Sequence, residues 1–339
     1  MLEQIDKWLK QKVIQPSKSP WCSPLVAVPK KNGKIRFCVD YRRLNSVTKP
    51  DAHPLPNVMV NLSKLAKSRV FSCLDSPGGF HAVKIADQDK EKTAFSGLNK
   101  LYEFNYMPFG LAGAPSSYSR LVQKVLENMG SDEVLVYLDD TCVHSRNNKT
   151  HLQSLERVLK AYQKAGLTVQ PSKTHLGRKQ VAYLGHLIDE KGMSVPTEYT
   201  KIVADWPLPK TVGEIRTFLG KVGYYRRFIK DFSALAHPLS SYVTKENETC
   251  VNKQLTLSQA AQQSFSRLKQ ELQRAPILAF PQFDSDKPFI VDTDFSNDPG
   301  AIGGVLSQEQ NGKERVIAYG ARKLLPREKN YASNKGELL

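Results

Sequence analysis

The segment with the clearest chemical potential is Val136-Tyr137-Leu138-Asp139-Asp140-Thr141, in which two adjacent carboxylates interrupt an apolar, strand-like run. Neighbouring aspartates repel one another, so the pair is costly unless a cation neutralises it. Hard divalent cations such as Mg²⁺ take carboxylate oxygens as ligands. An Asp-Asp pair is more often an ordinary surface turn, but the apolar flanks favour a metal site.

Asp75 supplies a further carboxylate at the end of another short apolar run, VFSCLD. By itself it is weak, because strand-terminal aspartates are common turn formers. A strand aimed at the acidic turn would put Asp75 beside Asp139 and Asp140. Such carboxylates could hold two ions about 3.5–4 Å apart, the arrangement with which phosphoryl transfer clamps the attacking and leaving oxygens.

The segments around these carboxylates predict an α+β fold with an antiparallel sheet and helices on one face. VFSCLD, HAVKI and the two halves of EVLVYLDDTCVHS have strand patterns. SSYSRLVQKVLENMG is an amphipathic helix that Gly130 closes, and residues 150–166 form a helix with Thr150 as N-cap. Upstream, residues 1–14 and NVMVNLSKLAKS are helical, while LVAV and IRFCV form a hairpin through residues 31–34.

Length and charge bound the function classes. The 339 residues suggest two or three domains, and the net charge of +16 favours a polyanionic partner. No apolar run approaches the ~18 residues that span a bilayer. The five cysteines are odd in number and lack a CxxC motif, which suits reduced thiols in an intracellular protein. Nucleic acid is therefore favoured over a membrane surface.

The character of the chain changes near residue 195. The run TVGEIRTFLGKVGYYRRFIKDFSALAHPLSSYV is helical, basic and aromatic, a mixture that suits gripping a nucleic-acid duplex without reading its sequence. By helical spacing we expect Phe218 and Phe228 inside and the cations outside. From Lys287 the strand-like runs FIVDTDFS, AIGGVLSQ and ERVIAYGARKL begin a further segment.

Several motifs, in order and at fitting spacing, resemble one family. FSCLD…GFH, MPFGLAGAPSSY, YLDD and YLGHLID are similar to the polymerase motifs of gypsy-type LTR retrotransposon reverse transcriptases. SKSPWCSPLVAVPKKNGKIRFCVDYRRLN resembles their fingers, and KIVADWPLPKTVGEIRTFLGKVGYYRRFIKDFSALAHPL resembles their thumb. The resemblance implies a right-hand polymerase: fingers and palm in 1–194, thumb and connecting helices in 195–284, and a truncated, partial RNase H-like α/β domain in 285–339.

The resemblance also implies roles for single residues. Catalysis and the binding of two Mg²⁺ ions, or Mn²⁺, fall to Asp75, Asp139 and Asp140. The nucleotide would contact Lys31, Arg36, Phe80, Phe109 and Gly110. The nucleic acid would contact Tyr137, Gly185, His186, Arg226 and Arg227. Asp294 and Glu337 match the first two RNase H carboxylates.

Two of these matches, and a further one at Lys173, have a plain structural alternative. Phe80 matches a steric gate at the ribose 2′-hydroxyl, although a core aromatic is the ordinary reading of such a residue. His186, in the primer-grip turn, is as readily a structural histidine. Lys173 falls where the family has a lysine that could protonate pyrophosphate, although a surface lysine is the commoner case.

The implied function is RNA-directed DNA polymerisation, in which a primer is extended on an RNA or DNA template with dNTPs. The implied location is the cytoplasm, inside the virus-like particle of a retroelement, and self-association or binding of other pol or gag products stays open. RNase H activity is not expected, because the family's further acidic residues and histidine are not reached. The alternatives are a decayed or domesticated copy that only binds nucleic acid, and a template-independent transferase. The first is raised by departures from the family pattern at Pro77, Gly78, Gly79 and Ala82.

Overall fold

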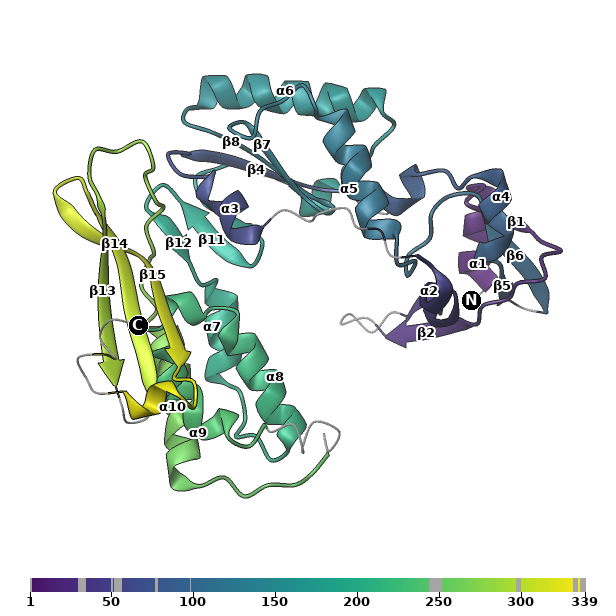
Figure 1. Cartoon of the computed structure of the whole chain (residues 1–339). Helices are drawn as coiled ribbons and strands as arrows, with labels where there is room; N and C mark the ends of the chain where they lie inside the picture. The colour runs from purple at the N-terminus through teal and green to yellow at the C-terminus, as the bar shows by residue number, and fades with distance from the viewer. Residues whose placement is uncertain are drawn as a thin grey trace. The chain divides into compact units, whose positions relative to one another are not determined.

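The computed structural model describes residues 2–29, 35–49, 51, 57–76, 79–97, 99–243, 252–296, 300–331 and 335. The chain divides into two compact units, Met1–Lys179 and Gln180–Leu339 (Figure 1). The two units differ in content, since the first carries the polymerase-like motifs up to Lys173 and the second begins just before the YLGHLID motif.

A four-stranded antiparallel sheet in the order β7-β8-β4-β9 forms the centre of the first unit. Its strands are β7 (Val134–Tyr137), β8 (Asp140–Ser145), β4 (Val70–Asp75) and β9 (His175–Arg178). Helices α5 (Ala114–Val125) and α6 (Asn148–Lys164) pack on one face of this sheet, where Leu74 and Val143 meet Tyr118, Val122 and Val158 in a buried core. The predicted antiparallel sheet with helices on one face is therefore confirmed.

The rest of the first unit has its own smaller core. Helix α1 (Leu2–Lys10) packs its buried Ile5 against a three-stranded sheet in the order β1-β6-β5. The remaining strands and short helices of the first unit are β1 (Ile14–Pro16), β2 (Leu25–Pro29), β3 (Ile35–Val39), α2 (Arg42–Val47), α3 (Val58–Ser63), η1 (Gly79–Ala82), α4 (Asp87–Lys90), η2 (Glu91–Thr93), β5 (Phe95–Gly97), β6 (Lys100–Phe104) and η3 (Pro171–Lys173). β2 and β3 form the predicted hairpin, whose turn lies outside the described residues.

Four local predictions are wrong. HAVKI is no strand: it begins in the 3₁₀ turn η1, and only Lys84 makes a single bridge, to Tyr106. The first helix ends at Lys10, because Lys12 takes a positive φ of 55° and the chain turns into β1. Helix α5 ends at Val125, short of Gly130. Helix α6 is capped by Asn147, whose side chain accepts from the Thr150 backbone N–H.

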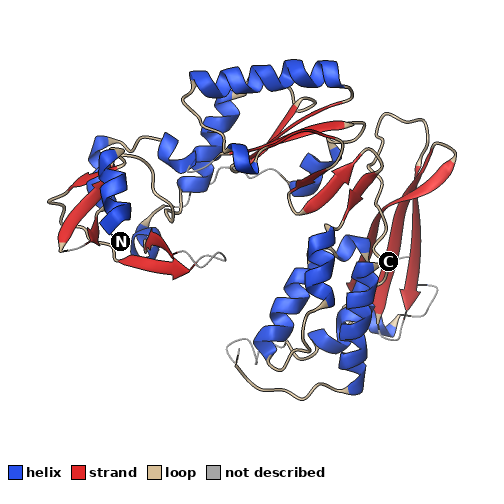
Figure 2. Cartoon of the chain, turned by 180° about the vertical axis from the view of Figure 1, so that it is seen from behind, coloured by secondary structure: helices blue, strands red, loops and turns tan. Residues whose placement is uncertain are grey.

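The second unit contains two antiparallel sheets and a helical group (Figure 2). Its elements are β10 (Val181–Tyr183), β11 (His186–Asp189), β12 (Gly192–Ser194), α7 (Thr197–Ala204), α8 (Val212–Gly223), η4 (Arg226–Phe228), α9 (Phe232–Ser240), α10 (Gln259–Gln273), β13 (Phe289–Ser296), β14 (Ala301–Gln310), β15 (Lys313–Lys323) and η5 (Glu328–Asn330). Phe218 and Phe228 are both buried, as predicted.

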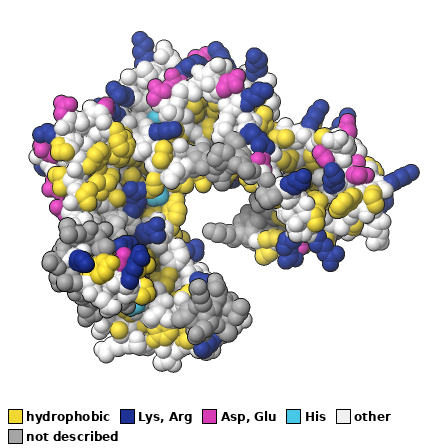
Figure 3. Space-filling model, viewed as in Figure 1, with side chains coloured by type: hydrophobic (Ala, Val, Ile, Leu, Met, Phe, Trp, Pro, Cys, Tyr) yellow, Lys and Arg dark blue, Asp and Glu magenta, His cyan; other side chains and the backbone are white. Residues whose placement is uncertain are grey.

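Charge is spread over both units. In the view of Figure 3, Lys and Arg side chains are scattered among Asp and Glu side chains and do not gather into a single patch on this face. None of the helices that the structure describes is long and apolar enough to cross a membrane. On this face the basic side chains of the described residues are therefore distributed rather than gathered in one groove.

Replacing Phe218 tests the helical core of the second unit. Its ring is fully buried, with its centroid 4.5 Å from that of Phe265 and 6.1 Å from that of Trp206. Phe218→Ala removes these contacts and leaves a cavity, so we expect a loss of about 3–5 kcal/mol in the unfolding free energy of this unit. Phe283→Ala is the control, because Phe283 is 77% exposed. Chemical denaturation followed by circular dichroism measures both, and equal losses would contradict the assignment of Phe218 to the core.

Candidate active site

Strand pairing brings the predicted carboxylates together. Asp75, the last residue of β4, is the direct register partner of Asp140, the first residue of β8. Asp140 is also the partner of Tyr137 across β7 and β8, so Leu138 and Asp139 form a two-residue turn between those strands. Asp75, Asp139 and Asp140 therefore lie at one end of the sheet, as the sequence predicts.

The turn itself is strained. Leu138 has a positive φ of 56°, a region that L-residues with a branched side chain rarely adopt. Glycine would be the ordinary choice at the first position of such a turn. The strain, of order 1 kcal/mol or more, is tolerated where the surrounding strands over-determine the backbone. The Leu138 backbone thus fixes where Asp139 projects.

The carboxylates share one electrostatic environment. Burial first, and then the charges of Asp139 and Asp75, raise the pKa of Asp140, while the Lys173 ammonium opposes this rise. Lys173 Nζ lies 3.4 Å from Asp75 Oδ2, so the sequence match at Lys173 is placed beside the predicted carboxylates. Among the described residues no three His, Cys, Asp or Glu side chains are already close enough to hold one ion. An ion would have to draw the carboxylates inward.

Segment Gln170–Arg178 runs beside β4 and contacts Asp75 at its start. The sequence did not predict this contact. The Gln170 N–H donates to the Asp75 carbonyl at 2.8 Å. Further along, the register between β4 and β9 shifts, and the Gly177 N–H donates instead to Ser72 Oγ at 2.9 Å. Ser72 is fully buried and also bonds His151 Nε2 at 2.7 Å. This network fixes the segment that carries Lys173.

The predicted nucleotide side assembles in part. The Phe80 ring is half-buried between the rings of Phe109, at 4.9 Å, and Tyr118, at 5.7 Å. A Cβ on Gly79 would meet the Tyr118 ring at 2.5 Å, so only glycine lets η1 lie this close to α5. The Phe80 ring is thus packed between two aromatic neighbours, one of them the partly exposed Phe109, and its match to a steric gate stays a prediction.

Gly110 adopts a positive φ of 97°, and a Cβ there would come within 3.3 Å of the Val39 carbonyl. Asn45 holds this loop on both sides: its Nδ2 donates to the Gly110 carbonyl at 2.8 Å, and its Oδ1 accepts from the Ala112 N–H at 2.9 Å. Arg36 pairs through its backbone with Val28 in the hairpin. The Arg36 side chain and all of Lys31 lie outside the described residues.

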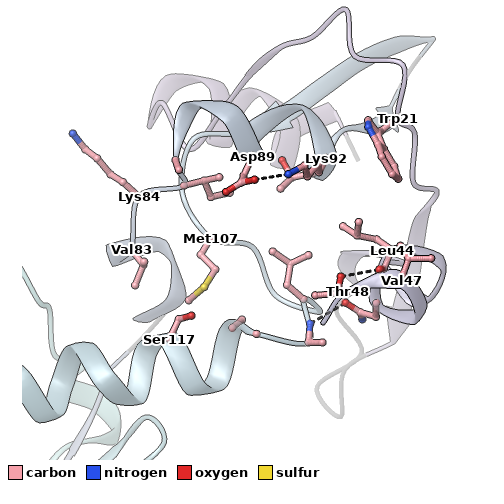
Figure 4. Close-up of a pocket in the computed structure, with 18 residues that line it drawn as sticks. Trp21, Leu44, Val47, Thr48, Val83, Lys84, Asp89, Lys92, Met107 and Ser117 are labelled. Carbon is pink, nitrogen blue, oxygen red and sulfur yellow. Dashed lines mark hydrogen bonds and ion pairs between the residues drawn. The ribbon is translucent and has the colours of Figure 1, made fainter. Parts of the chain in front are cut away.

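A cavity of about 550 Å³ adjoins the same loop (Figure 4). Its wall is mainly apolar and includes Trp21, Leu44 and Met107, while Lys84 points away from it and Asp89 pairs with Lys92 at its edge. The cavity contains none of the predicted carboxylates. It lies on the Asn45 side of the Gly110 loop and is thus separate from the acidic turn.

In the second unit, the turn between β10 and β11 is built on two positive φ angles, 46° at Leu184 and 71° at Gly185. Tyr224 Oη donates to the Leu184 carbonyl at 2.9 Å and Tyr225 Oη to the Gly185 carbonyl at 2.6 Å. His186 is only 2% exposed, and its ring stacks on Phe228. Burial lowers the pKa of His186, which therefore acts in this structure as a buried support of the turn, while Gly185 is exposed.

The remaining predicted residues are dispersed. Arg226 is exposed, whereas Arg227 is half-buried and burial lowers its pKa. Asp294 pairs with Gly303 across β13 and β14 and lines a cavity of about 200 Å³ together with Asp231. Glu337 lies outside the described residues. Tyr137 is half-buried at the edge of the acidic turn.

Sequence reasoning missed the residues that support the site, above all Asn45, Ser72 and His151. Each is a common polar residue without a motif of its own, and each acts on a segment distant in the chain. The single local signal was at Ser72, a hydroxyl inside the apolar run VFSCLD, since a buried polar group must find a partner.

Comparison with known families gives two matches. Residues 28–188 match the family "Reverse transcriptase (RNA-dependent DNA polymerase)", and residues 257–339 match "RNase H-like domain found in reverse transcriptase". Together these segments make up more than half of the chain. The first contains Asp75, Asp139 and Asp140, and the second contains Asp294.

Relatives and solved structures agree with these matches. The chain is 40% identical over 99% of its length to the retrovirus-related Pol polyprotein from transposon opus of Drosophila melanogaster, and 36% identical over 99% to that from transposon gypsy. It spans about a third of the length of these relatives, 34% and 33%. The foamy viral protease-reverse transcriptase dRH in complex with double-stranded DNA superposes with a TM-score of 0.88 at 26% identity, over 99% of this chain and 58% of that one. The foamy viral protease-reverse transcriptase in complex with an RNA/DNA hybrid gives a TM-score of 0.85 at 25% identity, over 99% of this chain and 44% of that one.

The raised pKa of Asp140 predicts that this carboxyl destabilises the metal-free protein at neutral pH. The folded state holds the proton more tightly than the unfolded chain, so stability falls as the pH rises through the folded pKa. In EDTA at pH 7, Asp140→Asn should raise the melting temperature of the first unit by about 1–2 °C. The gain should shrink as the pH falls through the raised pKa of Asp140, because the wild-type carboxyl then takes up its proton.

Asp87→Asn is the matched control for this experiment. Asp87 is an exposed carboxyl whose pKa is lowered by its hydrogen bond with Lys90, so its removal should give no gain. Differential scanning calorimetry across pH 3.5–8 measures both variants. If Asp140→Asn does not raise the melting temperature at pH 7, or raises it more in acid, the pKa of Asp140 is not raised in the folded protein.

Proposed function

The chain belongs to the reverse transcriptase family of retrotransposon Pol polyproteins, and on that premise we propose that it is an RNA-directed DNA polymerase that extends a primer with dNTPs. The observation that carries the proposal is the register pairing of Asp75 with Asp140 beside Asp139 at one end of the sheet. A protein that only binds nucleic acid has no need to bring these carboxylates together, because their mutual repulsion lowers stability.

The family generally uses divalent metal ions, and the donor set fits them. Asp75, Asp139 and Asp140 offer only hard carboxylate oxygens. Burial and then the charges of Asp139 and Asp75 raise the pKa of Asp140, and a cation would neutralise those charges. We propose two Mg²⁺ ions, with Mn²⁺ as a substitute, held by these three residues. Bound there, the ions would lower the pKa of the primer 3′-hydroxyl and neutralise the triphosphate and the pyrophosphate leaving group.

The chain's own groups would position the substrates. Lys173, 3.4 Å from Asp75, supplies a positive charge and a proton donor near the leaving group. Phe80 and Phe109 present a wall of two rings to the sugar, and Gly110 lets the incoming base pair approach the backbone closely. Lys31 and Arg36 would grip the triphosphate from the hairpin, by resemblance to the family.

Support for nucleic acid as the partner comes from two sides. The net charge of +16 favours a polyanion, and the superposed foamy viral protein is in complex with double-stranded DNA and with an RNA/DNA hybrid. Exposed Arg226 and the exposed turn at Gly185 are the groups of the second unit that we propose to contact the duplex backbone. His186 would act through the shape of that turn.

Primer extension on an RNA template with dNTPs and Mg²⁺ tests the proposal directly. Asp139→Asn should reduce the extension rate by at least about 10²-fold, since it removes one of three charged ligands while the strands stay paired. Asp87→Asn, an exposed carboxyl whose ion pair is with Lys90, should leave the rate unchanged. Omission of the template should abolish product, which separates the enzyme from a template-independent transferase. A folded wild type that binds primer-template but does not extend it would leave the binding-only alternative standing.

Phe80→Val tests the sugar wall. The ring lies against Phe109 and Tyr118, and a smaller side chain would open space where a ribose 2′-hydroxyl would otherwise clash. We expect the ratio of kcat/KM for rNTPs over dNTPs to rise by about 10–100-fold, with dNTP incorporation largely retained. Single-nucleotide incorporation measures both, and Phe232→Val, a half-buried aromatic of α9, is the control. An unchanged ratio would reduce Phe80 to a packing residue.

A further inference from the structure

Two cysteines face each other directly beneath the carboxylates. Cys73 of β4 is the register partner of Cys142 of β8, one step along from the Leu74–Thr141 pair and two from the Asp75–Asp140 pair. Directly opposed residues of an antiparallel pair point to the same face, with Cα atoms about 4.5–5.5 Å apart. This spacing lies within the range of about 4.4–6.8 Å that a disulfide requires.

We propose that Cys73 and Cys142 form a reversible cross-strand disulfide under mild oxidation, and that this bond switches off the adjacent carboxylate site. Both are free thiols in this structure. Because alternate residues share a face, the two sulfurs lie on the carboxylate face of the sheet, opposite the face packed on α5 and α6. The bond would join the two strands that position Asp75 and Asp140.

The two thiols differ in access, which sets the order of reaction. Cys73 is half-buried, while Cys142 is fully buried. Because Cys142 is 0% exposed, a reagent in solution does not reach its sulfur directly. The oxidant therefore reaches Cys73 first, and Cys142 acts as the resolving thiol.

Hydrogen peroxide is the oxidant for which the reaction balances without a further reagent. The Cys73 thiolate attacks one peroxide oxygen and the O–O bond breaks. This gives a sulfenic acid at Cys73 and, with one proton, a first water. The Cys142 sulfur then attacks the Cys73 sulfur, the S–O bond breaks, and the hydroxide leaves with the Cys142 proton as a second water. Two thiols are oxidised and one peroxide is reduced, and dithiothreitol reverses the change.

The effect on catalysis rests on the proposed function. The Cα spacing permits the bond, but a disulfide holds its two Cβ atoms about 3.8 Å apart. Directly opposed Cβ atoms of an antiparallel pair lie about 4.5–5.5 Å apart, so the bond must draw β4 and β8 together near Asp75 and Asp140. A two-ion site tolerates only about 0.5 Å of displacement in its ligands. Oxidation should therefore lower the extension rate by about tenfold or more, and reduction should restore it.

Peptide mapping tests the bond itself, whether or not the protein extends primers. The variant Cys22→Ser/Cys38→Ser/Cys250→Ser keeps Cys73 and Cys142 as its only thiols. After brief treatment with hydrogen peroxide, mass spectrometry under non-reducing conditions should show the Cys73 peptide linked to the Cys142 peptide in a monomer. Cys38 is the internal control in the wild type, because it is also half-buried on a strand but faces Val26. A folded protein without the linked peptide would overturn the proposal.

Primer extension before and after peroxide tests the switch. The wild type and the triple variant should lose activity and regain it with dithiothreitol, whereas Cys73→Ser should keep its activity in peroxide. If Cys73→Ser folds poorly, Cys73→Ala replaces it, and its melting temperature is measured to verify that it folds. Equal loss in the Cys73 variants would place the damage elsewhere and overturn the switch, as would a linked peptide with undiminished extension. Absence of extension in the reduced wild type would instead reject the proposed function.

Discussion

The carboxylates that face each other across β4 and β8 repel one another, and the rest of the first unit must hold them together against this repulsion. Asp75 and Asp140 are register partners, and Asp139 is the next residue in the turn. Their repulsion is an unfavourable term that strand pairing must overcome, and Lys173 offsets only part of it. Such a site is poised for cations, because a bound ion turns the repulsion into attraction.

The sheet can hold this arrangement because its opposite face is tightly fixed. On that face Leu74 and Val143 pack against α5 and α6, and two buried hydroxyls of the sheet bond to α6: Thr141 Oγ1 bonds Tyr162 Oη at 2.7 Å, and Ser72 Oγ bonds His151 Nε2 at 2.7 Å. The face packed on α5 and α6 thus makes the sheet rigid, while the opposite face carries the carboxylates. Both are possible because successive side chains of a strand point to opposite faces. The same alternation places Cys73 and Cys142 among the reactive groups.

Strained turns recur where function is proposed, and each is held by residues far away in sequence. Leu138 in the acidic turn and Leu184 in the second unit both take positive φ without being glycine. The second turn is fixed by hydroxyls of Tyr224 and Tyr225 and by the buried ring of His186. Strain of this kind persists only when packing leaves the backbone no other choice.

The sequence by itself determined the chemistry and the order of the elements. Carboxylates at the ends of apolar runs, a Pro-Phe-Gly loop before an amphipathic helix and a basic aromatic helix could be read because each is a local pattern of residue types. The sequence also predicted which strands flank Asp139 and Asp140. It failed at HAVKI, where alternation suggested a strand but the chain forms a 3₁₀ turn under Tyr118.

Only the tertiary structure decided what holds those residues in place. The clamp of Asn45 on the Gly110 loop, the bond from Ser72 to Gly177 and the opposition of Cys73 and Cys142 all join segments that are distant in the chain. These residue types are common and follow no helical or strand periodicity, so no sequence pattern predicts these contacts. The register of the strands decides which of these residues meet, and register is a property of two paired strands rather than of a single segment.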